Sequence, residues 1–545
     1  QAEDGIRDVE RSRGLGDVYK RQIKNKGAVP ITHIADDEEY WQKLKEKLQE
    51  EVDEFFKDSN EEELADILEV IYAICDFKNF DKEVSIVNEI EHIFRAYDIR
   101  GIVGKELTPE IVSKIGAVYA SYIGAPKKIA VAMDARTSSP LLKMAFISGA
   151  ASAGLDIEDL GLLPIPLLNF YVWQVNKTGG VMITASHNPP PYNGIRFRHS
   201  DGTGFAEENI DIKNMFLKGS FSYSSWDKLG IVTNIDSEYV KQLYYEFVNR
   251  NISVDRELTI VVDTGNGAAS VVAPYLFRNI NARVISINSH PDGTFPGRES
   301  DPLKSNLLAL RQTVIKCNAD FGVAYDGDGD RAVFVDDTGR IILPEKAGII
   351  FGKALLGKRP KSKNIVANIS CSIIVEEELS KAGGNIIHSK VGDVFVAQVA
   401  KENNAILGIE SSAHYFFPYF GFYYDDAIFG SLFMAEILSK EERRLSEIVN
   451  EIPTYPLKII SLECSDKIKF LVIDKLKEIL LKEDVQFNAL DGVKINEEGG
   501  WILVRPSNTE PIIRITIEGY NDQIISNIEG KYTPLLKNII KKLTS

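Results

Sequence analysis

The chain has 545 residues, of which 44% are hydrophobic and 26% charged, and its formal net charge is −16. This length indicates several domains, since single cores stop growing at roughly 250–300 residues. The negative charge excludes broad nucleic-acid binding, which needs a basic surface, and no apolar run reaches the roughly 18 residues of a membrane span. Four cysteines (Cys75, Cys317, Cys371 and Cys464) lack metal-ligand spacing, so we expect a cytoplasmic protein with reduced thiols. The sequence makes no prediction of the oligomeric state.

Residues 1–22 show no hydrophobic periodicity and no helix-cap pattern. The run "RSRGLGDVYKRQ" is typical of translated adapter or assembly sequence, and we expect the whole segment to be non-native. It is therefore excluded from the fold prediction.

The first predicted element is a helical hairpin within residues 23–80. Trp41, Leu44 and Leu48 recur at three- and four-residue steps, which indicates an amphipathic helix over 38–57. Ser59 or Asn60 caps a second helix that begins with acidic residues.

Acidic side chains on this hairpin could face one another across the two helices. Carboxylates at i and i+4 on one helix, and at i and i+3 on the next, can share a Mg²⁺ ion, although glutamates on a helix are more often a solvated face. The candidate metal ligands are Glu50, Glu51, Glu54, Glu63 and Asp66. Their spacing resembles the pattern of MazG-like nucleoside triphosphate pyrophosphohydrolases. Two alternatives remain open, namely a truncated remnant of such an enzyme and an oligomerisation element.

From about residue 94, short β-branched runs alternate with helical stretches. This alternation predicts the α/β class, with layered sheets of mixed or parallel strands. We expect three successive α/β units at residues 94–232, 233–340 and 341–453, followed by a final unit at 454–545.

"TASHNPPPYNGIRF" (184–197) places Ser186 at the carboxyl end of the strand-like "GGVMITA". A serine beside a metal can carry a phosphoryl group, whose charge the metal and nearby arginines neutralise. The alternative is a simple turn begun by Asn–Pro.

"YDGDGDR" (325–331) follows the apolar "FGVA". Asp326, Asp328 and Asp330 alternate with glycines, which let the loop turn so that the carboxylates converge on one hard cation. Position twelve of the loop is Asp337 rather than glutamate, so an EF-hand is rejected, and Mg²⁺ fits better than Ca²⁺. Arg331 could orient the carboxylates or contact phosphate, and an acidic turn is the alternative.

Two further polar loops lie between apolar runs. In "GIESSAH", Glu410, Ser412 and His414 alternate, so they would project to one side of an extended chain and suit sugar hydroxyls. In "RPSNTEP", the donors suited to phosphate are Arg505, Ser507, Asn508 and Thr509. Each loop taken alone is a weak signal.

The segments "FRAYDIRG", "MDARTSSP", "TASHNPPPYNGIRF", "DGDGDR", "GIESSAH" and "RPSNTEP" occur in this order over residues 94–545. In this the chain resembles the α-D-phosphohexomutases, and within them the bifunctional phosphomannomutase/phosphoglucomutase type. The resemblance implies a four-domain α/β architecture, with three similar domains and a smaller α+β C-terminal domain.

The resemblance also implies roles for residues. Ser186 would be the phosphoserine and a metal ligand, three aspartates would hold Mg²⁺, and a hexose 1,6-bisphosphate would be the activator. The residues implied at the catalytic end are Arg100, Arg136, His187 and Arg196, and the implied substrate contacts are Arg331, Lys390, Glu410, Ser412, His414, Arg505, Ser507, Asn508 and Thr509. The implied reaction interconverts mannose or glucose 1- and 6-phosphates. Alternatives are a phosphoglucosamine mutase and a low-turnover relative that binds sugar phosphates or forms bisphosphates.

Three positions depart from the family pattern. Arg196 stands where the pattern has a lysine with a proton-transfer role, Asp393 where it has histidine, and Ala413 where it has glycine. A guanidinium does not titrate near neutrality, whereas a buried lysine can. We therefore expect changes in rate and substrate range, with the reaction class kept.

Residue type alone predicts that Arg196→Lys keeps or raises kcat, because lysine restores a group that can exchange a proton. Steady-state turnover of hexose phosphates checks this. A collapse of activity would show that the arginine has a role of its own.

Overall fold

The computed structural model describes residues 37–58, 61–78, 91–175, 178–303, 307–465, 467–507 and 511–544. By its internal contacts the chain divides into two units, residues 1–92 and 93–545. Among the helices described, none combines the length and apolar character needed to cross a membrane.

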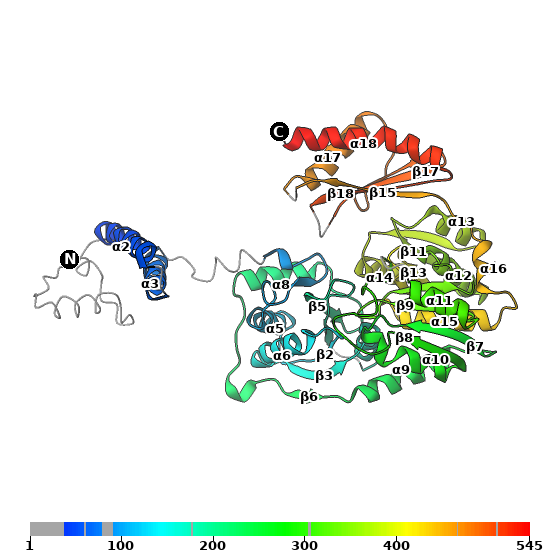
Figure 1. Ribbon diagram of the computed structural model, residues 1–545, viewed down its shortest axis with the longest axis horizontal. Helices are drawn as coiled ribbons and strands as arrows, with labels where there is room; N and C mark the ends of the chain where they lie inside the picture. The colour runs from blue at the N-terminus through cyan, green and yellow to red at the C-terminus, as the bar shows by residue number, and fades with distance from the viewer. Residues whose placement is uncertain are drawn as a thin grey trace, which may run out of the picture. The chain divides into compact units, whose positions relative to one another are not determined.

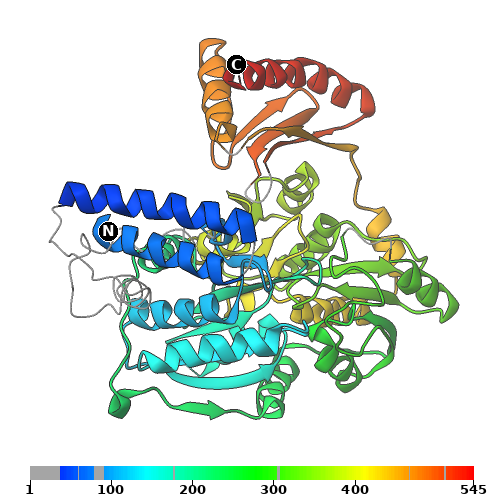
Figure 2. The same cartoon turned by 60° about the vertical axis from the view of Figure 1, so that its left-hand side comes forward.

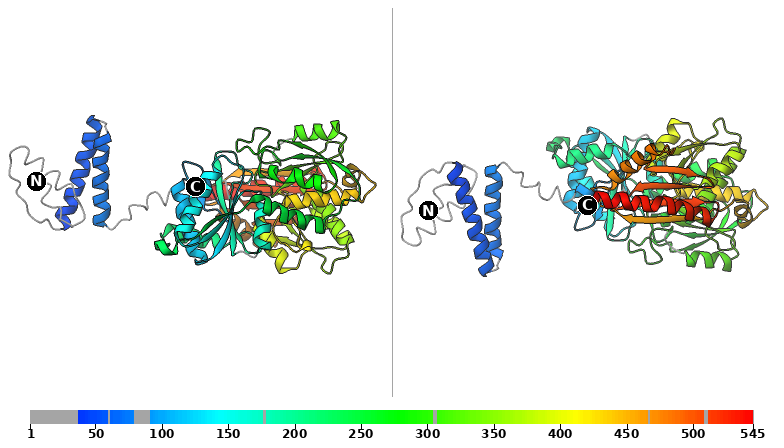
Figure 3. Two further views of the ribbon diagram at one scale, coloured as in Figure 1. Left: turned by 90° about the horizontal axis from the view of Figure 1, so that it is seen from below. Right: turned by 90° about the horizontal axis from the view of Figure 1, so that it is seen from above.

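The N-terminal unit contains the predicted helical hairpin, made of α2 (Asp37–Asp58) and α3 (Glu61–Lys78) (Figure 3). Trp41 of α2 stacks on Phe77 of α3 with ring centroids 6.0 Å apart, and Leu44 and Val70 are buried. Leu68 and Ile71 of α3 are exposed, so the apolar side chains of this helix are not all covered by α2.

The larger unit is built on four sheets, three of which repeat one topology (Figure 1). Each of the three contains three parallel strands, and the strand that comes first in the chain lies between the second and the third. A fourth strand pairs antiparallel with the outer side of the third. The first sheet has two additional strands at its edges.

The first sheet has the order β1-β5-β4-β2-β3-β6. Its strands are β1 (Ile99–Ile102), β2 (Lys128–Met133), β3 (Asp156–Leu162), β4 (Gly179–Ile183), β5 (Tyr192–His199) and β6 (Val232–Asn234). The helices of this part are α5 (Pro109–Ile123), α6 (Ser139–Ser152), α7 (Ile165–Gln174), α8 (Glu208–Leu217) and α9 (Ser237–Asn251).

The second sheet has the order β10-β9-β7-β8 and the third β12-β11-β13-β14. Their strands are β7 (Leu258–Asp263), β8 (Ala282–Ile287), β9 (Phe321–Tyr325), β10 (Ala332–Asp336), β11 (Asn364–Asn368), β12 (Asn385–Ser389), β13 (Leu407–Ile409) and β14 (Tyr415–Phe416). The accompanying helices are α10 (Ala273–Asn279), α11 (Leu308–Lys316), α12 (Pro344–Gly357), α13 (Ile373–Lys381), α14 (Asp393–Glu402), α15 (Ala427–Ser439) and α16 (Leu445–Asn450).

The fourth sheet is wholly antiparallel, in the order β15-β18-β17-β16. It consists of β15 (Leu457–Glu463), β16 (Val493–Glu497), β17 (Gly500–Pro506) and β18 (Ile512–Gly519). Helices α17 (Lys469–Lys482) and α18 (Asp522–Thr544) cover one of its faces (Figures 2 and 3). The predicted class, α/β with a smaller α+β domain at the end, is therefore confirmed.

Hydrophobic clusters among the described residues explain how these parts hold together. One cluster runs through the first three sheets and includes Leu168, Val262 and Phe433, so these domains share buried apolar surface. The fourth sheet has its own core and meets the third domain through a small contact that includes Trp501.

The tight crossing of α5 and α6 generates a stability prediction. A Cβ added at Gly149 of α6 would lie 1.8 Å from the Ser113 carbonyl oxygen, so we expect Gly149→Ala to force the helices apart and cost about 1–3 kcal/mol or more. A Cβ at Gly357, at the end of α12, meets no atom within 4 Å, so Gly357→Ala should keep or slightly raise stability. Chemical denaturation of both variants checks this, and equal midpoints would contradict the packing argument.

Candidate active site

Equivalent hairpin loops in the first three sheets supply the predicted site residues. The β4–β5 loop carries Ser186, the β9–β10 loop carries the three aspartates, and the β13–β14 loop carries Glu410, Ser412 and His414. The loops contact one another directly. Ser186 Oγ lies 2.9 Å from Asp326 Oδ2, and Ala332 N donates to the Ala413 carbonyl at 3.2 Å. The repeated topology thus brings three distant motifs to one place.

Ser186 is held in a conformation that few residues adopt. It is 2% exposed and has a φ of +48°, in the left-handed region that is costly for a residue with a Cβ. Thr184 Oγ1 accepts the Ser186 N–H at 2.8 Å and also lies within hydrogen-bond distance of Asp134 and Asp328. The surroundings therefore fix the serine hydroxyl toward the aspartates.

Arg136 shapes the backbone of the serine loop. Its Nη atoms donate to four carbonyl oxygens of this loop, at 2.6–3.0 Å, and its Nε donates to Asp134 Oδ2 at 3.0 Å. The accepting carbonyls are those of Ser186, Asn188, Pro189 and Tyr192. All five N–H groups of Arg136 are thereby engaged, so this buried residue positions the loop instead of presenting a free guanidinium.

Two other side chains border the serine. Arg100 Nη1 donates to Asn188 Oδ1 at 2.7 Å and its Nη2 pairs with Asp98. His187 Nδ1 lies 3.1 Å from Ser186 Oγ. Burial, with the charges of Arg331 and Arg100, lowers the pKa of His187 below its usual range, so the imidazole is neutral at physiological pH.

The three aspartates are at most 1% exposed. Burial raises the pKa of Asp326 well above its usual range, and burial followed by the charge of Asp330 raises the pKa of Asp328 to about 6. Burial also opposes ionisation of Asp330, but the charges of His414, Arg196 and Arg331 outweigh it and hold the pKa of Asp330 well below its usual range.

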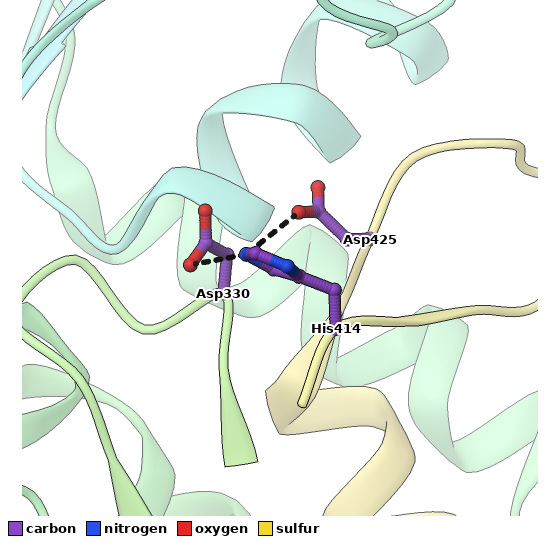
Figure 4. A group of neighbouring side chains, drawn as sticks. All are labelled: Asp330, His414 and Asp425. Atoms are coloured by element: carbon purple, nitrogen blue, oxygen red, sulfur yellow. Dashed lines mark ion pairs between the residues drawn. The ribbon is translucent and has the colours of Figure 1, made fainter. Parts of the chain in front are cut away.

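His414 links the β13–β14 loop to the β9–β10 loop, as Figure 4 shows for its contact with Asp330. Its Nδ1 lies 3.0 Å from Glu410 Oε2 and its Nε2 3.3 Å from Asp330 Oδ1 and 3.7 Å from Asp425 Oδ2. Burial opposes the charge, but Asp330 and Glu410 raise the pKa of His414 well above its usual range. His414 is therefore an imidazolium, which cannot ligate a metal.

Among the described residues, Asp326, Asp328 and Asp330 form a group close enough to share a metal ion. Asp328 Oδ1 is buried and accepts no hydrogen bond from the described residues, and Asp330 Oδ1 lies 3.3 Å from His414 Nε2. Around the site, six buried carboxyl groups face three guanidinium groups and His414. Burial raises the pKa of Asp326 and of Asp425, and a divalent cation beside Asp326 would favour its ionised form. The carboxylates are Asp326, Asp328, Asp330, Asp393, Glu410 and Asp425, and the cations are Arg196, Arg198, Arg331 and His414. The donor set fits Mg²⁺.

The three departures from the family pattern have physical counterparts. Ala413 has a φ of +69°, where a glycine would be unstrained. Arg196 donates to Asp330 Oδ2 at 2.7 Å through Nη1 and to Asp393 through Nη2, so two departures contact each other.

Four more predicted residues, Arg331, Lys390, Arg505 and Ser507, lie within the described part of the larger unit. Arg331 Nε is 3.9 Å from Asp326 Oδ2, and Lys390 is exposed with its Nζ 5.5 Å from the Phe395 ring centroid. Arg505 Nη2 is 3.3 Å from Asp491 Oδ2, and Asp491 accepts a hydrogen bond from Val391 N at 3.1 Å. Asp491 therefore connects Arg505 to the residue that follows Lys390. Ser507 is buried, whereas Asn508 and Thr509 lie outside the described residues.

In the hairpin of the N-terminal unit, the predicted carboxylates are placed differently. Glu51 is buried, with an oxygen 2.6 Å from Lys47 Nζ, and Glu50 pairs with the same lysine at 3.1 Å. Glu54 and Asp66 are exposed, and the side chain of Glu63 lies outside the described residues. Metal binding by this hairpin stays a prediction.

Several residues that shape the site were missed from sequence. Thr184 is the first residue of the serine loop. Its position directly after a strand and two residues before Ser186 could have indicated that its hydroxyl contacts the serine. Asp134, two residues before Arg136, and Asp425, in "YYDD", carried no local signal, because their partners are distant in sequence.

Fold and site together define the class: a four-domain enzyme arranged for phosphoryl transfer. Four family models match in succession, namely the phosphoglucomutase/phosphomannomutase alpha/beta/alpha domains I (residues 91–222), II (237–339) and III (344–455) and the C-terminal domain (460–531). The chain belongs to the phosphoglucomutase/phosphomannomutase family of the α-D-phosphohexomutases, which confirms the resemblance seen in the sequence.

Individual relatives agree with this assignment. A protein of Methanopyrus kandleri named as a probable phosphoglucosamine mutase is 36% identical over 452 residues, which cover 83% of this chain and 99% of the relative. A Thermococcus kodakarensis protein named phosphoglucomutase/phosphomannomutase is 34% identical, with coverage of 79% and 95%. The crystal structure of a family member from Burkholderia thailandensis superposes with a TM-score of 0.75 at 27% identity, covering 82% of this chain and 98% of that one.

The hydroxyl of Thr184 generates a prediction for this site. Thr184→Val leaves the Ser186 N–H buried without its acceptor, which costs about 1–3 kcal/mol, and we expect phosphorylation of the serine to slow roughly tenfold. Thr184→Ser keeps the hydroxyl and should restore both properties. Phosphoprotein yield over time and thermal unfolding measure the two effects; a valine variant as active as the serine variant would contradict this role.

Proposed function

We propose that the protein is a phosphohexomutase that interconverts glucosamine 6-phosphate and glucosamine 1-phosphate through a phosphoserine at Ser186. The observation that carries the proposal is the contact of Ser186 Oγ with Asp326, 2.9 Å apart, inside a buried group of three aspartates. The sugar is proposed from the name of the Methanopyrus relative, which supports the phosphoglucosamine alternative better than mannose or glucose.

In the proposed reaction, the free hydroxyl oxygen of the sugar phosphate bonds to the phosphorus on Ser186. The bond from phosphorus to the serine oxygen breaks, and the proton of the sugar hydroxyl ends on that oxygen. His187, neutral and 3.1 Å from Ser186 Oγ, lies where a proton can pass to the serine. The product is a hexosamine 1,6-bisphosphate.

The second half-reaction reverses the first. After the bisphosphate turns, its other phosphoryl group is transferred back to Ser186, and the hydroxyl released on the sugar takes the proton. Arg505 and Ser507, with Asn508 and Thr509, are proposed to bind the phosphate that does not react, because one fixed phosphate site serves both orientations. Lys390, Glu410 and Ser412 are proposed to contact the sugar.

Asp326, Asp328 and Asp330 would hold Mg²⁺, together with an oxygen on Ser186. A divalent ion there would neutralise charge on the transferring phosphoryl group. The protein itself supplies the positions: Arg136 and Thr184 hold the loop, and Arg331 adds a positive charge beside Asp326.

A second candidate is turnover of glucose or mannose phosphates, as first expected from the sequence. The observation that favours it is the 34% identity to the Thermococcus protein named phosphoglucomutase/phosphomannomutase.

Phosphorylation of Ser186 is testable by intact mass. Incubation with glucose 1,6-bisphosphate and Mg²⁺ should add one phosphoryl group to the wild-type protein and none to Ser186→Ala, which should retain less than about a thousandth of the mutase activity because the carrier is gone. Turnover of glucosamine, glucose and mannose 1-phosphates, assayed side by side, then ranks the sugars. Phosphorylation that persists in Ser186→Ala, or the absence of mutase turnover on all three sugars, would refute the proposal.

A further inference from the structure

Arg196 and Asp393 lie far apart in the chain and contact each other in the fold. Arg196 is on β5, in the first sheet, and Asp393 is the first residue of α14, beside the third sheet. Both side chains are 6% exposed. Arg196 Nη2 donates to Asp393 Oδ2, while Arg196 Nη1 donates to Asp330 Oδ2 at 2.7 Å.

The planar guanidinium explains how one side chain contacts both carboxylates. Its two Nη atoms point in fixed directions, so binding to Asp393 also fixes the nitrogen that contacts Asp330. Lysine offers a single charged nitrogen and cannot reproduce this fork. Asp330 Oδ2 is thereby held by Arg196, and Asp330 Oδ1 lies 3.3 Å from His414 Nε2, so contacts from two other domains fix this carboxylate beside the other aspartates.

Each member of the pair depends on the other. If Arg196 were removed, Asp393 would lose its direct partner. Arg198 would remain nearby, with its Nη1 3.7 Å from Asp393 Oδ2. If Asp393 were neutral, the guanidinium would face Asp330 and also Asp328, 3.8 Å from Nη1, and would compete with a cation for them. A buried charge without its partner is costly, so removing either residue should displace the one that remains.

We propose that Arg196 and Asp393 form a coupled positioning pair that orients Asp330 as a metal ligand. The pair acts through Asp330 and does not contact the reacting atoms. This inference rests on the metal site in the proposed function. It reverses the expectation from residue type, because the geometry requires a fork that lysine lacks.

The test is Mn²⁺ binding to the full-length protein, measured by electron paramagnetic resonance. Arg196→Lys and Asp393→Asn should each raise the Kd for Mn²⁺ by roughly 10- to 100-fold, the range typical when a partner of a metal ligand is lost. The double variant should have a Kd for Mn²⁺ no higher than that of the single variant with the higher Kd. The reason is that all three variants lose the same coupled interaction. kcat at limiting Mg²⁺ should fall in parallel.

Arg196→Gln distinguishes a positioning role from charge repulsion, because the two predict opposite changes in the Kd for Mn²⁺. If Arg196 acted only as a positive charge near the ion, its removal would tighten Mn²⁺ binding, whereas loss of positioning weakens it.

Lys401→Gln is the matched control. Lys401 of α14 lies 2.6 Å from Asp201, which follows β5, so this pair joins the same two segments without touching the aspartates. Its Kd for Mn²⁺ should equal that of the wild type.

The outcomes separate the two proposals. A wild-type protein that binds no Mn²⁺ would refute the metal site itself. Mn²⁺ binding by the wild type with an unchanged Kd in Arg196→Lys and Asp393→Asn, or with a Kd raised equally in Lys401→Gln, would overturn the pair. If Arg196→Lys does not fold, Asp393→Asn decides alone.

Discussion

The burial of a cluster of carboxyl groups is the constraint on which this structure depends. Carboxylates as deeply buried as Asp326, Asp328 and Asp330 are unfavourable unless charges of opposite sign lie beside them. Of the four cations named above, the second domain provides one, Arg331. The aspartates follow β9 in the second domain, while Arg196 comes from the first domain and His414 from the third. Docking of three domains is therefore a condition for a stable charged centre.

The repeated topology makes that docking productive. In each of the first three sheets, the loop with the candidate site residues joins the third parallel strand to the antiparallel strand beside it. A hairpin loop at this position is anchored on both sides by strand pairing, so its orientation follows from the sheet. The backbone strain at Ser186 and Ala413 is sustained by this anchoring and by hydrogen bonds such as those from Arg136.

Sequence reasoning found what is encoded locally. Alternating Asp and Gly after an apolar strand, and a serine at a strand end, carry their chemistry within a few residues, so the loops and the class of fold could be predicted. Contacts between distant segments could not be predicted in the same way. Arg136 was expected at the catalytic end, but only the fold shows that its donors are all used on the serine loop. Arg196 and Asp393 looked like two independent departures, because nothing in either segment indicates that they meet.

The division of the site among domains would give the proposed ion a second physical role. An ion that binds the assembled carboxylates and not the separated domains shifts the equilibrium toward the docked state, by mass action. The first three domains share a continuous apolar core, so this shift adds to an assembly that is already cohesive. The fourth domain has its own core and a small contact with the third, and it carries the loop proposed to bind the distal phosphate. Under the proposed function, ion occupancy would consolidate the reacting end, while the distal phosphate would be bound by a domain with a core of its own.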